Sequence, residues 1–215
     1  MSEGYSILVD TSKCTACRGC QIACKEWNQL PGVPTKNVGS HENPQDLSAA
    51  TWKILRFSEG KKPEGQPFWY FFSEQCRHCM NPGCMAESEK DEIVQDEKTG
   101  AVLFTPKTKD LKYEATRKGC PFDIPRKDEK TGVLMKCTMC FDRITNNMEP
   151  ACVKTCPTDA LEFGPREKIL DAAKKRVAEL KKTYPKAAAL NADDVRVIYL
   201  VTDDPKTYWK FAAGK

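Results

Sequence analysis

The stretch that decides the fold runs from Cys14 to Cys24 and reads CTACRGCQIAC, with two, two and three residues between successive cysteines. A second stretch begins at Cys76 and reads CRHCMNPGC. A third begins at Cys137 and reads CTMC, and two more cysteines follow after gaps of eleven and three residues. The remaining cysteine of the 12, Cys120, stands alone and is followed directly by proline. So many cysteines at so few spacings indicate ligands of a repeated metal centre.

Disulfides, zinc sites and iron–sulfur clusters are the three uses open to these cysteines. Disulfides at this density belong to short secreted scaffolds, whereas this chain has 215 residues. Cys-x2-Cys pairs would suit a zinc ribbon, so a zinc-stabilised interaction module is an alternative. The spacing of two, two and three residues, however, is the bacterial ferredoxin pattern, to which a proline after the last cysteine also belongs. The sequence therefore predicts three [4Fe–4S] clusters as cofactors, with all 12 cysteines as iron ligands.

The ferredoxin pattern also assigns the cysteines to clusters. Its first three thiolates hold one cluster, and its fourth thiolate holds a neighbouring cluster. Exchange of these fourth ligands predicts three quartets of thiolates. They are quartet 1, with Cys14, Cys17, Cys20 and Cys156; quartet 2, with Cys24, Cys137, Cys140 and Cys152; and quartet 3, with Cys76, Cys79, Cys84 and Cys120.

The solitary position of Cys120 suggests that a fourth cluster has been lost. Counting back from Cys120 by the ferredoxin spacing places the three missing thiolates at Asp110, Tyr113 and Thr116. Counting on from the second stretch places the fourth at Ser88. Because all four ligands are absent together, the pattern favours deletion of a whole cluster. The alternative is that residues 110–116 are an ordinary loop that never bound one.

Composition and charge exclude several functions. The chain is 40% apolar and carries 34 basic and 30 acidic residues, a formal net charge of +4. Each cluster with four thiolates would add about two negative charges, so we interpret the basic residues as counter-charge and expect no nucleic-acid binding. No apolar stretch reaches about 18 residues, so we expect no membrane span. No Gly-x-Gly-x-x-Gly motif precedes a helix, which leaves nicotinamide and flavin binding without support, and no catalytic residues are predicted.

The elements around the cysteines predict an α+β fold of two interlocked bacterial-ferredoxin-like modules, with loop insertions and a C-terminal helix–strand extension. Strands are expected at 5–9, 52–57, 68–72 and 195–201, and helices at 21–27 and 165–184. Two hairpins, 93–103 and 126–134, share Asp-Glu-Lys-Thr-Gly at their bends, which indicates an internal repeat. The predicted parts are a two-cluster module of residues 1–27 plus 133–165, a one-cluster module of residues 68–132, an insertion of residues 28–67, and a helix, strand and tail of residues 166–215 for subunit contact.

A few polar residues near the cysteines are candidates for tuning the clusters. His78 lies inside the second cysteine stretch and is interpreted as a structural or hydrogen-bonding residue, with potential tuning as the alternative. Three lysines, Lys25, Lys136 and Lys154, stand beside predicted ligands and would raise cluster potentials. The alternative for each of these lysines is a solvated surface position.

Three segments together carry a family resemblance: 136–143 (KCTMCFDR), 149–158 (EPACVKTCPT) and 119–125 (GCPFDIP). With the opening cysteine stretch, they resemble the iron–sulfur subunits of molybdenum and tungsten bis-pterin oxidoreductases over roughly residues 1–165. A typical member has four clusters, so this chain departs from the family at the four positions named above. A three-cluster subunit without a C-terminal membrane helix is most similar to the beta subunits of soluble formate dehydrogenases from sulfate-reducing bacteria.

The resemblance implies an electron-transfer subunit that catalyses nothing alone and forms a heterodimer with a large catalytic subunit holding the molybdenum or tungsten pterin. It implies that the quartet 1 cluster lies next to that subunit, that quartet 2 follows, and that quartet 3 is distal. The lost cluster would have been the outermost, which fits a soluble acceptor such as a multihaem cytochrome c. We expect no export signal on this chain and a location in the periplasm by co-export with a signal-bearing partner, with the cytoplasm as the alternative.

Two further functions compete with this interpretation. The chain could serve another enzyme of the same family, an oxyanion, polysulfide or thiosulfate reductase, and the identity of the large subunit would decide. It could also be a free polyferredoxin, although the insertion and the C-terminal region enlarge its surface beyond what a carrier needs.

Overall fold

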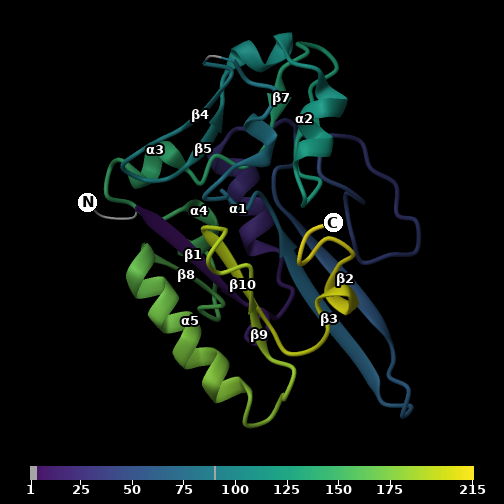
Figure 1. The fold of residues 1–215 in the computed structure, drawn as a ribbon. Coiled ribbons are helices and arrows are strands. Elements are labelled where there is room, and N and C mark those ends of the chain that lie inside the picture. The colour runs from purple at the N-terminus through teal and green to yellow at the C-terminus, as the bar shows by residue number, and fades with distance from the viewer. Residues whose placement is uncertain (1–3, 90) are drawn as a thin grey trace.

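The computed structural model describes residues 4–89 and 91–215 and has the predicted α+β fold (Figure 1). Residues 1–3 and 90, which belong to predicted modules, lie outside the described residues. The strands are β1 (Tyr5–Asp10), β2 (Ile54–Lys61), β3 (Pro67–Glu74), β4 (Ile93–Gln95), β5 (Val102–Phe104), β6 (Arg126–Lys127), β7 (Leu134–Met135), β8 (Leu161–Pro165), β9 (Ala188–Leu190) and β10 (Val197–Val201). The helices are α1 (Gly19–Trp27), α2 (Tyr113–Gly119), α3 (Phe141–Ile144), α4 (Ala151–Lys154), α5 (Arg166–Leu180) and α6 (Pro205–Tyr208), with 3-10 turns η1 (Gly83–Met85) and η2 (Pro106–Asp110).

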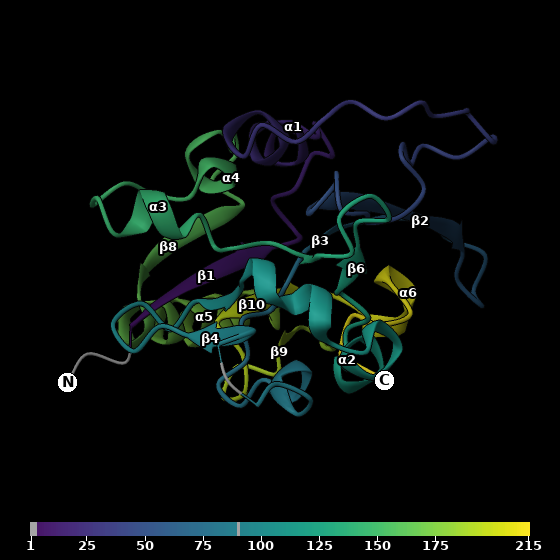
Figure 2. The ribbon, with the colours of Figure 1, turned by 90° about the horizontal axis from the view of Figure 1, so that it is seen from above.

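A four-stranded sheet in the order β8-β1-β10-β9 forms the centre of the molecule. β1 pairs parallel with β10, with Ile7 opposite Val197, and antiparallel with β8, with Ile7 opposite Phe163. Side chains alternate between the two faces of a strand. Leu8 and Ile198 accordingly share a core with residues of α5, whereas Ile7 and Val197 share one with cysteines of the first and third stretches. Figure 2 shows α1 and α4 on one side of β1 and α5 on the other.

The C-terminal region is an integral part of this sheet. The predicted helix at 165–184 and strand at 195–201 are confirmed as α5 and β10, each somewhat shorter than predicted. Residues 166–215 are predicted to form an extension, yet β10 is an inner strand between β1 and β9 and is buried along its whole length. Its uninterrupted apolar sequence, VIYLV, is typical of a strand covered on both faces.

The other strands form three antiparallel pairs. β2 and β3 pair from Ile54 opposite Glu74 to Lys61 opposite Pro67, so both predicted strands are present. β3 is longer than predicted at both ends, whereas β2 begins two residues later and ends four residues later than predicted. β4 pairs with β5 and β6 with β7, which confirms the two repeated hairpins. Gly100 and Gly132 at their bends have φ of 75° and 77°, a conformation that glycine adopts without strain.

The segment before Cys120 is helical, in contrast to the loop considered as an alternative. Asp110 ends η2, while Tyr113 and Thr116 lie in α2. Thr116 is fully buried, and its Oγ1 donates to the carbonyl oxygen of Lys112 over 3.3 Å. A short helix with a buried threonine thus stands where a fourth set of cysteines would have been. Loss of an ancestral cluster stays a prediction.

Candidate iron–sulfur centres

The four thiols of quartet 2 line one cavity. Cys24 lies on α1, Cys137 and Cys140 precede α3, and Cys152 lies on α4. All four are buried, so their sulfur atoms face a common space that is largely closed to solvent.

The four thiols of quartet 3 line a second cavity, of about 340 Å³. Cys79 is half-buried, and Cys76, Cys84 and Cys120 are buried. Cys120 follows α2 and is brought to the others by a close approach of two glycines. A Cβ atom on Gly83 would lie only 2.5 Å from the carbonyl oxygen of Gly119, so a side chain there would push Cys84 and Cys120 apart.

Quartet 1 is the most open of the three. Cys17 is exposed, Cys14 and Cys156 are half-buried, and Cys20 is buried. Burial raises the pKa of Cys14, the backbone N–H of Ala16 opposes this rise, and the thiolates of Cys156 and Cys17 raise the pKa further. The opening stretch and the last cysteine therefore face each other, in line with the packing of α1 against α4.

The backbone of the cysteine loops is shaped to surround a group of atoms. Left-handed φ values occur at Arg18 (61°), His78 (47°) and Met139 (60°), which fold the chain back around the thiols. The same bond recurs in each loop, from a backbone N–H to the sulfur two residues earlier. It joins Gly19 to Cys17 (3.4 Å), His78 to Cys76 (3.4 Å), and Met139 to Cys137 (3.3 Å). Such bonds favour the thiolate form and tune a bound cluster.

The thiols of quartet 2 lie near those of both other quartets. Burial raises the pKa of Cys20 to about 11. Lys53 lowers this pKa, and the thiolate of Cys152, a member of quartet 2, raises it. Burial likewise raises the pKa of Cys137, and the largest further rise comes from Cys76, a member of quartet 3. Cys20 and Cys152 also share one hydrophobic core, and Cys137 and Cys76 share another, so quartet 2 is a neighbour of both quartet 1 and quartet 3.

The donor sets fit [4Fe–4S] clusters. Burial raises the pKa of Cys140 to about 11 and that of Cys79 and Cys84 to about 12, so these thiols keep their protons at pH 7 unless a metal displaces them. Within residues 4–89 and 91–215, no three Cys, His, Asp or Glu side chains lie close enough to hold one metal ion. A single zinc ion needs its four sulfurs at about 2.3 Å, whereas the iron atoms of a cluster separate the thiolates. The assignment of each thiolate to a cluster stays a prediction.

Two buried lysines accompany the quartets. Lys53, which the sequence analysis did not identify, is 2% exposed, lines the cavity of quartet 2 and donates to Oε1 of Gln75. Burial acts to lower the pKa of Lys53, but the thiolates of quartets 1 and 2 outweigh it, and the pKa lies above its ordinary value. Lys136 is 4% exposed and lines the cavity of quartet 3. The one signal for Lys53 is its position between Trp52 and Ile54, two large apolar residues of the predicted strand at 52–57.

The other polar candidates have different environments. Nδ1 of His78 accepts a hydrogen bond from the backbone N–H of Val102 over 3.0 Å, and the side chain is fully buried, which confirms its structural role. Burial, with Lys136 and Arg196, holds the pKa of His78 well below its usual range, so the imidazole is neutral. Lys154 is exposed, which agrees with the alternative of a solvated surface position. Lys25 donates to two backbone carbonyl oxygens.

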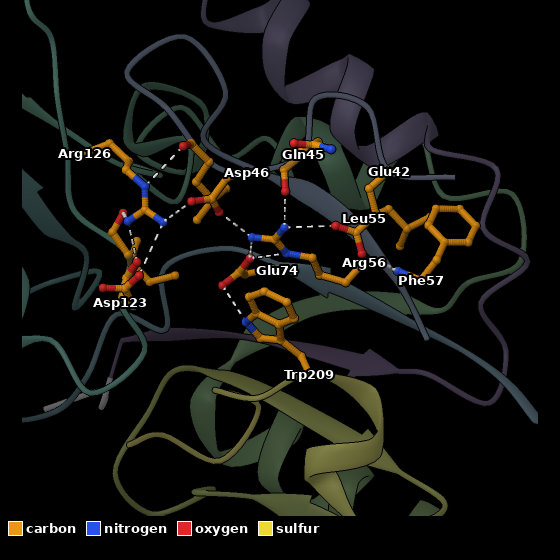
Figure 3. A network of polar contacts seen from close by, with 12 residues as sticks. Glu42, Gln45, Asp46, Leu55, Arg56, Phe57, Glu74, Asp123, Arg126 and Trp209 are labelled. Atoms are coloured by element: carbon orange, nitrogen blue, oxygen red, sulfur yellow. Dashed lines mark hydrogen bonds and ion pairs between the residues drawn. The ribbon is translucent and has the colours of Figure 1, made fainter. Parts of the chain in front are cut away.

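A network of charged residues joins the 28–67 insertion to the rest of the chain (Figure 3). Arg56 on β2 forms ion pairs with Glu74 on β3 (2.6 Å) and with Asp46 in the insertion (2.5 Å). Asp46 also pairs with Arg126 (3.0 Å). Trp209 of the tail donates to Glu74 (2.9 Å), and its ring lies 4.0 Å from the Arg56 guanidinium. Trp209 of the tail therefore packs within the chain, and so does Tyr208, whose ring stacks on Tyr70.

Comparisons with known proteins agree with the chemistry of the site. The family described as 4Fe–4S dicluster domain matches residues 67–166, which contain eight of the cysteines. The chain is 47% identical over 218 residues to "Formate dehydrogenase subunit beta" of Megalodesulfovibrio gigas, with all of both chains covered. It is 46% identical to "Formate dehydrogenase 2 subunit beta (cytochrome c-553)" of Nitratidesulfovibrio vulgaris, with 96% of this chain and 97% of that protein covered.

A longer relative is the nitrate-inducible formate dehydrogenase iron–sulfur subunit of Escherichia coli, which is 38% identical over 94% of this chain and 70% of its own length. Within the described residues, no helix is long and apolar enough to cross a membrane.

Proposed function

This chain belongs to the family of formate dehydrogenase iron–sulfur (beta) subunits, and from this premise we propose that it carries electrons through three [4Fe–4S] clusters between a catalytic subunit and an external acceptor. The observation that carries the proposal is the presence of three groups of cysteine thiols, with the thiols of quartet 2 near those of both other quartets. Eight cysteines in the dicluster region and four in the opening stretch support a count of three clusters.

The residues of this chain have three tasks in the proposed function. The cysteines of each quartet hold iron, and a [4Fe–4S] cluster, when bound, takes up or releases one electron at a time. The backbone N–H groups that bond to Cys17, Cys76 and Cys137 stabilise negative charge on sulfur. Burial of quartets 2 and 3 excludes water, which keeps the response of the surroundings to a moving charge small.

The openness of quartet 1 supports its proposed place beside the catalytic subunit. Cys17 is the exposed thiol among the 12 cysteines, so a partner that covers it would lie close to the first cluster. We propose that this partner is a large subunit with a molybdenum or tungsten pterin, and that the two form a heterodimer. Quartet 3 would then give electrons to a soluble cytochrome c, an acceptor supported by the words "cytochrome c-553" in a relative's name.

The proposed compartment is the periplasm, reached by co-export with the large subunit. Fractionation of cells that express both subunits tests it. The chain should appear in the periplasmic fraction only when the large subunit keeps its own export signal, and periplasmic recovery without that signal would contradict co-export.

Anaerobic purification followed by iron and sulfide analysis tests the number of clusters. Three clusters predict about twelve iron atoms and about twelve sulfides per chain, together with a large subunit that purifies with it. About sixteen iron atoms would contradict the loss of a fourth cluster, and about eight would remove one quartet. A colourless protein that contains zinc and no iron would contradict the proposal altogether.

A further inference from the structure

The two buried lysines lie where neighbouring quartets meet. Lys53 lines the cavity of quartet 2, and it is also within electrostatic reach of Cys14 and Cys20 of quartet 1. Lys136 lines the cavity of quartet 3 and immediately precedes Cys137, a member of quartet 2. Each junction between neighbouring quartets therefore has one lysine.

Neither lysine has a carboxylate partner among the described residues. Nζ of Lys53 donates to the amide oxygen of Gln75, a neutral group that is itself fully buried. Nζ of Lys136 donates to the backbone carbonyl oxygens of Val102 and Cys137. These acceptors fix the position of each ammonium group, but they leave its positive charge uncompensated.

An uncompensated charge in a protein interior is strongly unfavourable. Arg56 and Arg126, both buried, each have carboxylate partners. Arg56, for example, is 2% exposed and is surrounded by the carboxylates of Asp46 and Glu74. For Lys53 and Lys136 the nearby groups that can carry negative charge are the cysteine thiols of the quartets, which become thiolates when iron is bound.

We propose that Lys53 and Lys136 are fixed counter-charges that set the reduction potentials of the clusters at the two junctions, Lys53 between quartets 1 and 2 and Lys136 between quartets 2 and 3. This inference rests on the proposed electron-transfer function. Reduction adds one negative charge to a cluster, so a nearby ammonium group favours the reduced form and raises the potential. The effect is strong here because both lysines are buried, so bulk solvent screens their charge little.

The two lysines differ in what they reach, so removing them has different effects. In Lys53→Met, the clusters of quartets 1 and 2 should shift to more negative potentials. In Lys136→Met, the cluster of quartet 3 should shift most, because Lys136 acts on Cys84 and Cys120. Methionine is unbranched and apolar, so it fills much of the same space without the charge.

The test is an EPR-monitored redox titration of the full chain, purified anaerobically with its clusters and with any subunit that accompanies it. Lys154→Met is the matched control, because Lys154 also stands between two predicted ligands but is exposed to solvent. It should shift the potentials far less than either buried variant. Iron content is measured for every variant before titration, and Cys120→Ala identifies which signal belongs to quartet 3.

The outcomes separate the inference from the function on which it rests. Absence of iron from the anaerobically purified wild-type chain would overturn the electron-transfer function itself. Fully loaded Lys53→Met with unchanged potentials would overturn the inference alone, as would identical effects of Lys53→Met and Lys136→Met on every signal. If the Lys53→Met variant loses iron, the iron content of a Lys53→Arg variant is measured next. Normal iron content in Lys53→Arg supports a role for the positive charge. Loss of iron in this variant as well contradicts that role.

Discussion

Cys120 completes quartet 3 from a separate segment of the chain, and this makes it the sharpest test of the cluster assignment. In Cys120→Ala, the cavity of quartet 3 keeps three thiols, so its cluster should be lost or converted. Complete loss of this cluster should remove about four of about twelve iron atoms, and conversion to a three-iron cluster about one, while the EPR signals of the other two clusters remain. Ser88→Ala is the control, since Ser88 stands where a lost ligand is predicted, and it should keep all its iron. Disappearance of the quartet 1 signal in Cys120→Ala would show that the quartets are paired wrongly.

Single residues also show what the sequence could and could not reveal about the site. The cysteines could be predicted because a ferredoxin loop fixes both the ligand type and the number of residues between ligands. Lys53 carries no such pattern, and a lysine in a strand is far more often solvated than buried. Its role depends on thiols that lie 29 to 39 positions before it and 84 to 99 positions after it, so only the folded chain brings the charge to them.

At the scale of elements, the sheet depends on β10. Ile198 on this strand is fully buried in the core that also contains Ile169 and Ala173 of α5. Ile198→Ala should cost about 2–5 kcal/mol, which for a chain of this size lowers the thermal midpoint by roughly 4 to 20 °C at a fixed scan rate. Ile22→Ala is the matched control, because Ile22 is 53% exposed and its loss should change little. Equal effects of the two variants would mean that β10 does not support the fold.

Elements near the cysteines could be predicted more completely than the sheet that supports them. The strand at 5–9, the helix at 21–27 and both hairpins carry local signals of alternation, periodicity and turn residues. The apolar run at 195–201 also identifies a strand. Its partner could not be predicted, because β1 lies about 190 residues earlier and nothing local specifies which strands pair.

At the scale of the whole molecule, the clusters are expected to hold the fold together. Thiols of quartets 2 and 3 belong to the same hydrophobic cores as β1 and β10, and their cavities would otherwise be lined by groups without partners. Removal of iron by a chelator under reducing conditions should therefore unfold much of the chain, with loss of near-UV circular dichroism. Added zinc should not restore the signal, since the thiols are arranged too widely for one ion. Retention of the native spectrum without iron would contradict this expectation.

The parallel pairing of β1 with β10 also determines when the molecule can mature. β1 leads directly into the first cysteine stretch, and it leaves the ribosome about 190 residues before its partner strand. At typical rates of synthesis this interval lasts roughly 10 to 40 seconds. During that time the thiols of the opening stretch have neither the sheet beneath them nor Cys137, Cys152 and Cys156 beside them. We therefore expect iron–sulfur assembly on quartets 1 and 2 to be a late, post-translational event, for which these thiols have to stay reduced until the last strand arrives.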